Sequence, residues 1–350
     1  FTYYKTDSRN QILKLATTAA SGYTSQVRNA GHIRNRGYEI QLGAVPIQTS
    51  KGFRWNLDLN YGANSSKVVK LDDEGLITSY QLYSSGIQIL ASVGEAYGTL
   101  FGTSYVRDAN GNVVVDANGL PKISTTNKTL GKFTPDWTGG ISNTFSYRSL
   151  SLSFLIDASV GGSIFSNTNK TGKYTGVLAN TLSGRDAEHG GLWYYTDAMG
   201  NNVRLPESPS YSVSSDGLYY AQVNGQSTRV YQDGIMVEGV TESGSKNEEV
   251  VSAEKYYHRI YSIAEANVYD ASYVKLREVA LSYRLPRLWT QKLHLQEASV
   301  TLTGRNLWTI YKSVPNIDPE SALTTGNAQG VEAYSLPTTR SFGVNLSVKF

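Results

Sequence analysis

The sequence of 350 residues contains no cysteine and no uninterrupted apolar run of 18 residues or more. The lack of a long apolar run excludes a transmembrane helix, which needs about 20 predominantly apolar residues. The lack of cysteine leaves no disulfide and fits a secreted or outer-membrane bacterial protein, although many cytosolic proteins share it. Charge of one sign is scarce too: the formal net charge is +3, and no Lys/Arg run exceeds two residues. We therefore predict no binding to nucleic acid.

Motifs of catalysis and metal binding are also missing. The sequence has neither a Gly-x-Ser-x-Gly nucleophile turn nor a phosphate-binding Walker loop. Asp318 and Glu320 superficially resemble a glycosidase pair, but spacing alone does not show that two carboxyl groups converge, so we interpret them as a loop anchor. The four histidines lack metal-ligand spacing; they are His32, His189, His258 and His294. We predict no enzyme, no metal site and no cofactor.

Tyrosine is abundant, with 25 Tyr and 5 Trp against 9 Phe. Rings with a polar edge suit membrane-interface belts and sugar-stacking surfaces. The hydrophobic fraction of 40% and the mean hydropathy of -0.32 resemble those of a soluble protein. They do not exclude a β-barrel, because lipid-facing and lumen-facing residues alternate along its strands and average to near neutral.

The last eleven residues, 340–350, alternate between apolar and polar side chains and stop on Phe350. Phe342, Val344, Leu346 and Val348 share one side of the predicted strand with Phe350. A terminal aromatic residue that closes a strand of nearly membrane-spanning length is typical of bacterial outer-membrane barrels. We therefore expect Phe350 to be a recognition end for the barrel-insertion machinery.

The same alternation predicts eight strands in all. The seven most regular ones are 38–44, 53–61, 141–147, 150–158, 279–283, 298–302 and 342–350, and a less regular one covers Phe1 to about Leu13. The connections alternate strictly between long and short ones. The long ones lie near 14–34, 67–136, 163–271 and 311–339, and the short ones near 46–52, 148–149 and 286–296.

Long loops on one side and short turns on the other are how outer-membrane barrels are built. We predict an all-β fold, a transmembrane antiparallel β-barrel. A hairpin hidden in a long loop would add two strands and leave the alternation intact. Residues 1–6 read as the inside of a strand and not as a signal peptide. We therefore expect residues 1–350 to be the carboxy-terminal portion of a larger, 22-stranded barrel, with a plug domain and earlier strands outside this sequence.

Four segments in order carry a family resemblance. They are Asn29-Ala-Gly-His-Ile-Arg-Asn-Arg-Gly-Tyr-Glu-Ile40, Asp136-Trp-Thr-Gly-Gly-Ile-Ser-Asn-Thr-Phe-Ser-Tyr147, Asp270-Ala-Ser-Tyr-Val-Lys-Leu-Arg-Glu-Val-Ala-Leu-Ser-Tyr-Arg-Leu-Pro286, and Gly304-Arg-Asn-Leu-Trp-Thr-Ile-Tyr311 with Asp318-Pro-Glu320. They resemble the SusC/RagA-type TonB-dependent outer-membrane transporters of Bacteroidota. The third segment is the most specific, and the resemblance is weakest across 163–250. His32 departs from the pattern, since the family more often has an acidic residue there.

The resemblance implies nutrient import across the outer membrane. A SusD-like surface lipoprotein would lid the barrel and capture an oligosaccharide or, in some members, a peptide. TonB would then pull on the plug to open a path. This chain would supply barrel wall and surface loops and catalyse no reaction. Two alternatives are an outer-membrane barrel enzyme with a catalytic rim and an adhesive or structural barrel without transport.

Aromatic side chains in the longest loop are the candidate contacts with ligand or lid. They are Trp193, Tyr194, Tyr195, Tyr219, Tyr220, Tyr256 and Tyr257. The alternative interpretation is that these rings pack the loop's own core or lie in the interface belt.

Three charged residues lie in predicted strands, namely Asp157, Arg277 and Arg305. Charge that faces lipid at the bilayer midplane costs about 2–4 kcal/mol, so we predict that all three face the lumen. A duplicated Asp-Ala-Asn-Gly sequence at 108–111 and 116–119 spaces oxygen atoms like part of a calcium loop. It lacks the remaining ligands, and Asn-Gly is a strong hairpin signal, so we favour a plain hairpin there.

Overall fold

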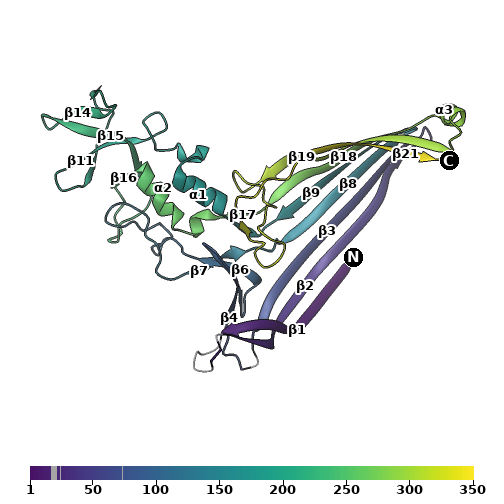
Figure 1. The fold of residues 1–350 in the computed structure, drawn as a ribbon, viewed down its shortest axis with the longest axis horizontal. Coiled ribbons are helices and arrows are strands. Elements are labelled where there is room, and N and C mark those ends of the chain that lie inside the picture. Colours follow the sequence, from purple (N-terminus) through teal and green to yellow (C-terminus); the bar gives the residue numbers. More distant parts are fainter. Residues whose placement is uncertain (17–21, 24, 73) are drawn as a thin grey trace.

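Eight antiparallel strands form the principal sheet in the computed structural model, which describes residues 1–16, 22–23, 25–72 and 74–350 (Figure 1). Neighbours in this sheet, which we call the wall, follow the order of the chain. Its strands are β1 (Thr2–Ala16), β2 (Ser25–Gln48), β3 (Phe53–Lys70), β8 (Trp137–Tyr147), β9 (Leu150–Val160), β18 (Tyr273–Arg284), β19 (Glu297–Lys312) and β21 (Ser341–Lys349). Each predicted strand overlaps one of these, so the prediction of eight strands is confirmed.

The predicted long connection at 14–34 is wrong, because both flanking strands extend into it. β1 runs to Ala16 and β2 begins at Ser25, and the pairing of the two strands continues to these residues. The pattern hid the extension because Asn29 and Gly31 interrupt the apolar alternation between Val27 and Ile33. At the end of this stretch, Arg34 pairs with Asp7 of β1 at 2.8 Å. Residues 17–21 and 24 lie outside the described residues.

The two faces of the wall differ in chemistry. On one face apolar residues stand opposite one another from strand to strand, as in the row Leu152, Leu281, Leu302 and Val344. One residue further along, the other face carries the polar row Ser151, Ser282, Thr301 and Asn345. The apolar row is not packed against the rest of the chain, since Leu302 is 52% exposed and Val344 is 74% exposed. Such a continuous exposed apolar face is rare on a soluble surface and is the pattern of a sheet with lipid on one side and water on the other.

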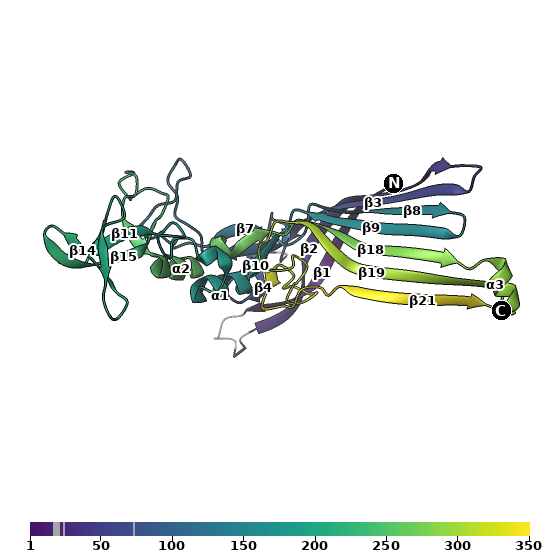
Figure 2. The ribbon, with the colours of Figure 1, turned by 90° about the horizontal axis from the view of Figure 1, so that it is seen from above.

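The long connections after β3, β9 and β19 are as predicted, but the connection between β1 and β2 is shorter than the turn between β18 and β19, so the strict alternation of lengths is wrong at the first connection. Short turns join β2 to β3, β8 to β9 and β18 to β19, and the last of these turns contains helix α3 (Arg287–Lys292). Figure 2 shows α3 and the end of β21 at one end of the wall and the folded long loops at the other. Among the described residues, no helix is both long enough and apolar enough to cross a membrane.

The long loops contain structure of their own. One four-stranded sheet consists of β4 (Ser79–Ser84), β5 (Gln88–Ser92), β6 (Tyr97–Gly102) and β7 (Lys128–Lys132). A larger sheet consists of β11 (Leu192–Thr196), β12 (Asn202–Arg204), β13 (Tyr211–Val213), β14 (Tyr219–Val223), β15 (Gln226–Met236) and β16 (Val250–Ser252). A third joins β10 (Ser163–Ser166), β17 (Val268–Asp270) and β20 (Val331–Glu332). The helical elements are α1 (Asn167–Thr175), η2 (Ala179–Thr181), α2 (Ala253–Tyr261) and η3 (Glu265–Asn267). None of these strands extends the wall.

Three long loops pack into one unit, which we call the cap: residues 71–72 with 74–136, residues 161–272 and residues 313–340. Its main cluster takes Leu100 from the first loop, Phe165 from the second and Val331 from the third, each 0% exposed. The contact between β10 and β20 adds a parallel backbone pairing of the second and third loops. The cap is therefore a folded body with a shared apolar core.

Truncating this core should loosen all three loops together. Leu100→Ala should cost about 2–5 kcal/mol, because it removes a buried side chain and leaves a cavity. Hydrogen exchange should rise in residues 163–166 and 331–332 as well as around residue 100. Leu336→Ala is the control, since Leu336 is 90% exposed. Faster exchange confined to residues 88–102 would contradict a shared core.

Candidate functional site

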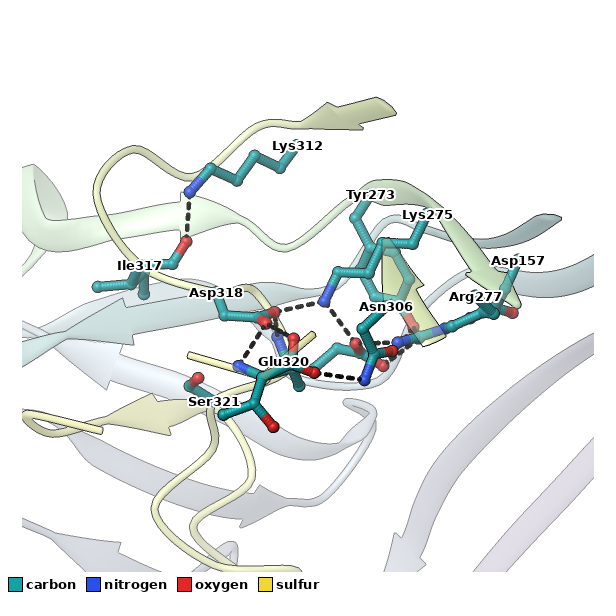
Figure 3. A network of polar contacts seen from close by, with 12 residues as sticks. Asp157, Tyr273, Lys275, Arg277, Asn306, Lys312, Ile317, Asp318, Glu320 and Ser321 are labelled. Atoms are coloured by element: carbon teal, nitrogen blue, oxygen red, sulfur yellow. Dashed lines mark hydrogen bonds and ion pairs between the residues drawn. The ribbon is translucent and has the colours of Figure 1, made fainter. Parts of the chain in front are cut away.

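The cap is bound to the wall by a buried ion cluster at the end of β18 (Figure 3). The Nζ atom of Lys275 lies 2.6 Å from Oδ1 of Asp318 and 2.6 Å from Oε2 of Glu320. The Lys275 and Asp318 side chains are only 3% and 7% exposed. A buried ammonium is tolerated when carboxylates and hydrogen bonds satisfy it, so the third loop of the cap is tied to this point of the wall.

A bulge in β18 brings Arg277 into the same cluster. The pairing register of β18 shifts between Leu276 and Glu278. A bulge turns its extra side chain away from the regular alternation. The Nε atom of Arg277 donates to Oδ2 of Asp157 at 2.8 Å, and its Nη1 atom donates to Oε2 of Glu320 at 2.7 Å. Arg277 thus links β9, β18 and the third loop.

The two carboxyl groups of the ion cluster, those of Asp318 and Glu320, are held ionised. Burial alone would raise the pKa of Asp318, but hydrogen bonds from Lys275 and Thr338 lower it to about 2. Burial likewise opposes ionisation of Glu320, and the hydrogen bonds from Arg277 and Lys275 hold its pKa below the usual range. A glycosidase pair needs one carboxyl group with a raised pKa as general acid. The ion pairs instead agree with the interpretation of this pair as a loop anchor.

Asp157, Arg277 and Arg305 all bind charged partners along the polar side of the wall. Asp157 accepts from Arg277, and Nε of Arg305 lies 2.8 Å from Oε2 of Glu278. In register, Arg305 stands opposite Ser341, next to the row of serine and threonine residues. That the three line a water-filled lumen stays a prediction.

A second buried group joins the third loop to helix α1, and the sequence patterns did not indicate it. Glu332 is 0% exposed and accepts hydrogen bonds from Ser166 Oγ at 2.7 Å and from Thr168 Oγ1 at 2.6 Å. These partners stand at the first turn of α1, where a carboxylate is favoured by the free N–H groups and the helix dipole. Asn169, also 0% exposed, donates through Nδ2 to the carbonyl oxygen of Pro315 at 3.0 Å.

Trp193 and Tyr194 are core residues of the cap. Trp193 is 6% exposed and packs with Ala221 and Val230, and Tyr194 is 4% exposed. The Tyr194 ring stacks on Tyr231 at 5.1 Å, and its hydroxyl donates to Asp233 Oδ1 at 3.1 Å. These rings therefore follow the alternative interpretation, that they pack the loop's own core.

The other five candidate rings differ in their surroundings. Tyr195 and Tyr219 pack against the Trp193 cluster, and Tyr220 is half-buried beside them. Tyr256 and Tyr257, on α2, line a cavity. Contact of any candidate ring with a ligand or lid stays a prediction, and the cavity makes Tyr256 and Tyr257 the strongest candidates.

This cavity has a volume of about 710 Å³ and lies between α1, α2 and β15. A smaller cavity of about 370 Å³ adjoins it, and Lys173 and Tyr257 line both. Burial lowers the pKa of Lys173 to about 8, and its Nζ atom donates to the carbonyl oxygen of Ala266 at 2.8 Å. Both volumes lie in the range of small-ligand sites, and tyrosine rings and polar side chains form part of each lining.

No metal site is seen in the described part of the chain, which has no group of three or more His, Asp or Glu side chains placed to hold an ion. The duplicated turns are hairpins, as favoured. Oδ1 of Asp108 accepts from the backbone N–H of Asn110 and Asn112, and Oδ1 of Asp116 accepts from those of Asn118 and Leu120. These carboxylates therefore already accept hydrogen bonds from the backbone of their own turns.

The wall and cap define the class: part of an antiparallel membrane β-barrel with folded loops at one end. No family model matches the sequence. The chain is similar to "TonB-dependent receptor P3" of Formosa agariphila, 26% identical over 379 residues, covering 100% of this chain and 32% of that protein. It is also 24% identical to "TonB-dependent receptor P26" of the same organism over 99% of its length. The chain spans about a third of these relatives, 32% of each.

Solved structures show the same fold. "Structure of the RagAB peptide transporter" matches with a TM-score of 0.59 and 19% identity, covering 99% of this chain and 33% of that one. The same importer in its "open-open" state matches with a TM-score of 0.59 and 16% identity. The resemblance to TonB-dependent transporters of the RagA type and the predicted barrel fold class are thus confirmed.

Removing the Lys275 ammonium should release the third loop. Lys275→Ala leaves Asp318 without its cationic partner, and breaking a buried pair in this way costs about 3–5 kcal/mol. Limited proteolysis should then cut residues 313–340 much faster than in the parent protein. Lys255→Ala is the matched control, because Lys255 is exposed on α2. Equal cleavage in both variants would show that the cluster does not hold the loop.

Acid should release the same loop in a defined window. Asp318 has a pKa of about 2 when folded and about 3.9 when unfolded. The stabilisation it contributes is therefore complete above about pH 4 and is lost as the pH falls towards 2. Hydrogen exchange of residues 313–340, corrected for its intrinsic pH dependence, should follow this curve, and Asp318→Asn should flatten it. Release that begins above pH 5 would contradict the assignment.

Proposed function

We propose that the full-length protein imports a nutrient across the bacterial outer membrane by a TonB-dependent mechanism. This chain contributes barrel wall and extracellular loops. The observation that carries the proposal is the similarity to TonB-dependent receptors along the whole chain, combined with a wall whose apolar face is exposed. A SusD-like surface lipoprotein is the proposed lid, docked on the cap, and TonB acts through a plug region outside these residues.

The cargo in this proposal is an oligosaccharide or a peptide. The similarity in fold to a peptide transporter supports the peptide. The ring-lined cavity in the cap suits either, because tyrosine stacks on sugar faces and also packs against peptide side chains. Enzymatic activity is not part of the proposal, since the paired carboxylates of the third loop are held ionised by Lys275 and Arg277.

Uptake by the full-length receptor tests this function. A strain that lacks the receptor gene should lose uptake of one labelled glycan or peptide class, and the intact gene should restore it. Dissipating the proton-motive force should abolish this uptake while surface binding persists. Uptake that continues without the proton-motive force would refute TonB coupling, and unchanged uptake of every class tested would refute import.

Filling the cap cavity tests its part in import. Met236 lines the cavity, and Met236→Trp should raise the half-saturating concentration for uptake about tenfold, the equivalent of about 1.4 kcal/mol. Met199→Trp is the matched control, since Met199 is 85% exposed at a turn of the cap. If both variants import like the parent protein at equal surface abundance, the cavity takes no part in binding.

A further inference from the structure

The three short turns of the wall carry basic side chains and no acidic ones. These turns are 49–52, 148–149 and 285–296, and their sequences contain no Asp or Glu. They contain four Lys or Arg residues, Lys51, Arg148, Arg287 and Lys292, all exposed. We call these four residues the basic rim.

The basic rim is not neutralised within the described part of the chain. Arg284, just before the third turn, is paired with Glu297 at 2.9 Å and is left out of the rim for that reason. No carboxylate of the described residues lies within ion-pair distance of the four rim residues. The Arg148 guanidinium lies over the Tyr147 ring, 5.2 Å from its centroid. The rim is thus free to bind an anionic partner.

Helix α3 adds an apolar surface beside these charges. Leu288 is 74% exposed, Trp289 is 58% exposed and Leu293 is 61% exposed. Thr290, on the opposite side, is 2% exposed and marks the face that packs on the protein. Burying a large apolar side chain is worth roughly 1.5–3 kcal/mol, so three exposed ones on six residues call for a partner. Apolar side chains among lysine and arginine are the composition of a segment that lies in a membrane interface.

The neighbouring strand ends show where that interface lies. Tyr147 and Tyr283, the last aromatic residues before two of the turns, are 46% and 41% exposed on the apolar side of the wall. They stand in register with Leu150, which begins the apolar face of β9. Exposed tyrosine at the edge of an apolar belt is typical of a membrane–water boundary. The exposed face of α3 and the basic rim therefore continue the lipid-facing belt.

We propose that the short-turn end binds anionic phospholipid headgroups through the basic rim, with Leu288, Trp289 and Leu293 inserted into the same leaflet. The charge is of one sign and unpaired, and the apolar patch continues the belt, which together favour a phospholipid leaflet over a protein partner. The inference rests on the proposed membrane placement of the wall and goes beyond import itself. It gives the third short turn the role of an anchor that sets the depth of the barrel.

Lipid quenching tests the insertion of α3. The chain has no cysteine, so Leu288→Cys in a full-length receptor freed of other cysteines can carry a single environment-sensitive dye. In phosphatidylcholine vesicles with brominated chains, the dye at residue 288 should be quenched nearly as strongly as at Leu302→Cys on the belt. Met199→Cys in the cap should stay unquenched.

Each of the other possible results contradicts a particular part of the proposal. Quenching at residue 302 but not at 288 refutes the insertion of α3 and leaves the barrel placement standing. Shielding of residue 288 from both brominated lipid and aqueous iodide assigns α3 to a protein contact and also refutes it. A lack of quenching at both residues refutes the membrane placement together with the insertion.

Lipid selectivity tests the basic rim. Native mass spectrometry of the receptor should show preferential retention of phosphatidylglycerol over phosphatidylcholine. Each removed rim charge should lower this preference about fivefold. The test variant is Lys51→Gln/Arg287→Gln/Lys292→Gln, and the control is the cap variant Arg204→Gln/Lys246→Gln/Lys255→Gln. Equal preference in both variants would refute headgroup binding by the rim.

Discussion

The position of the third loop on the wall depends on one buried ammonium group, that of Lys275. Its desolvation is offset by two carboxylates at 2.6 Å, so the third loop has one favourable position against the wall. From that position Pro315 meets α1 and Val331 enters the shared apolar cluster. Glu332 then satisfies the first turn of α1. The ion cluster on β18 and the contacts of Glu332 thus hold the third loop between the wall and the other two loops of the cap.

The wall obeys a different constraint, since its two faces meet different media. Exposed leucine and valine on one face and serine, threonine and asparagine on the other explain how a mean hydropathy of -0.32 accompanies a membrane fold. Where β1 and β2 extend beyond this region, Asp7 binds His32 and Arg34 across the two strands. At the short-turn end, the leucine residues of the apolar face are followed first by tyrosine and then by lysine and arginine. The kind of side chain at a position of the wall therefore indicates how deep that position lies in the membrane.

The wall could be predicted from sequence because alternation is local: each strand records its own two faces. The cap could not, because its contacts join distant residues, such as Lys275 with Asp318, 43 positions apart, and Thr168 with Glu332, 164 apart. In the sequence, Arg277 is singled out as a charged residue inside a strand. The ammonium group that binds both Asp318 and Glu320 belongs instead to Lys275, two residues earlier. The aromatic run at Trp193 likewise shows what composition cannot tell. The same residue type serves as a buried core ring and as a ring that stacks on a ligand.

Residue-by-residue accessibility along β21 (Ser341–Lys349) is the most direct test of the wall as a membrane barrel. Spin labels placed singly from 341 to 349 in the full-length receptor in vesicles would be probed with oxygen and with a water-soluble nickel complex. Labels at 342, 344, 346 and 348 should respond to oxygen, and those at 341, 343, 345 and 347 to nickel. Equal responses at odd and even positions, or the opposite alternation, would contradict a strand with lipid on its apolar face.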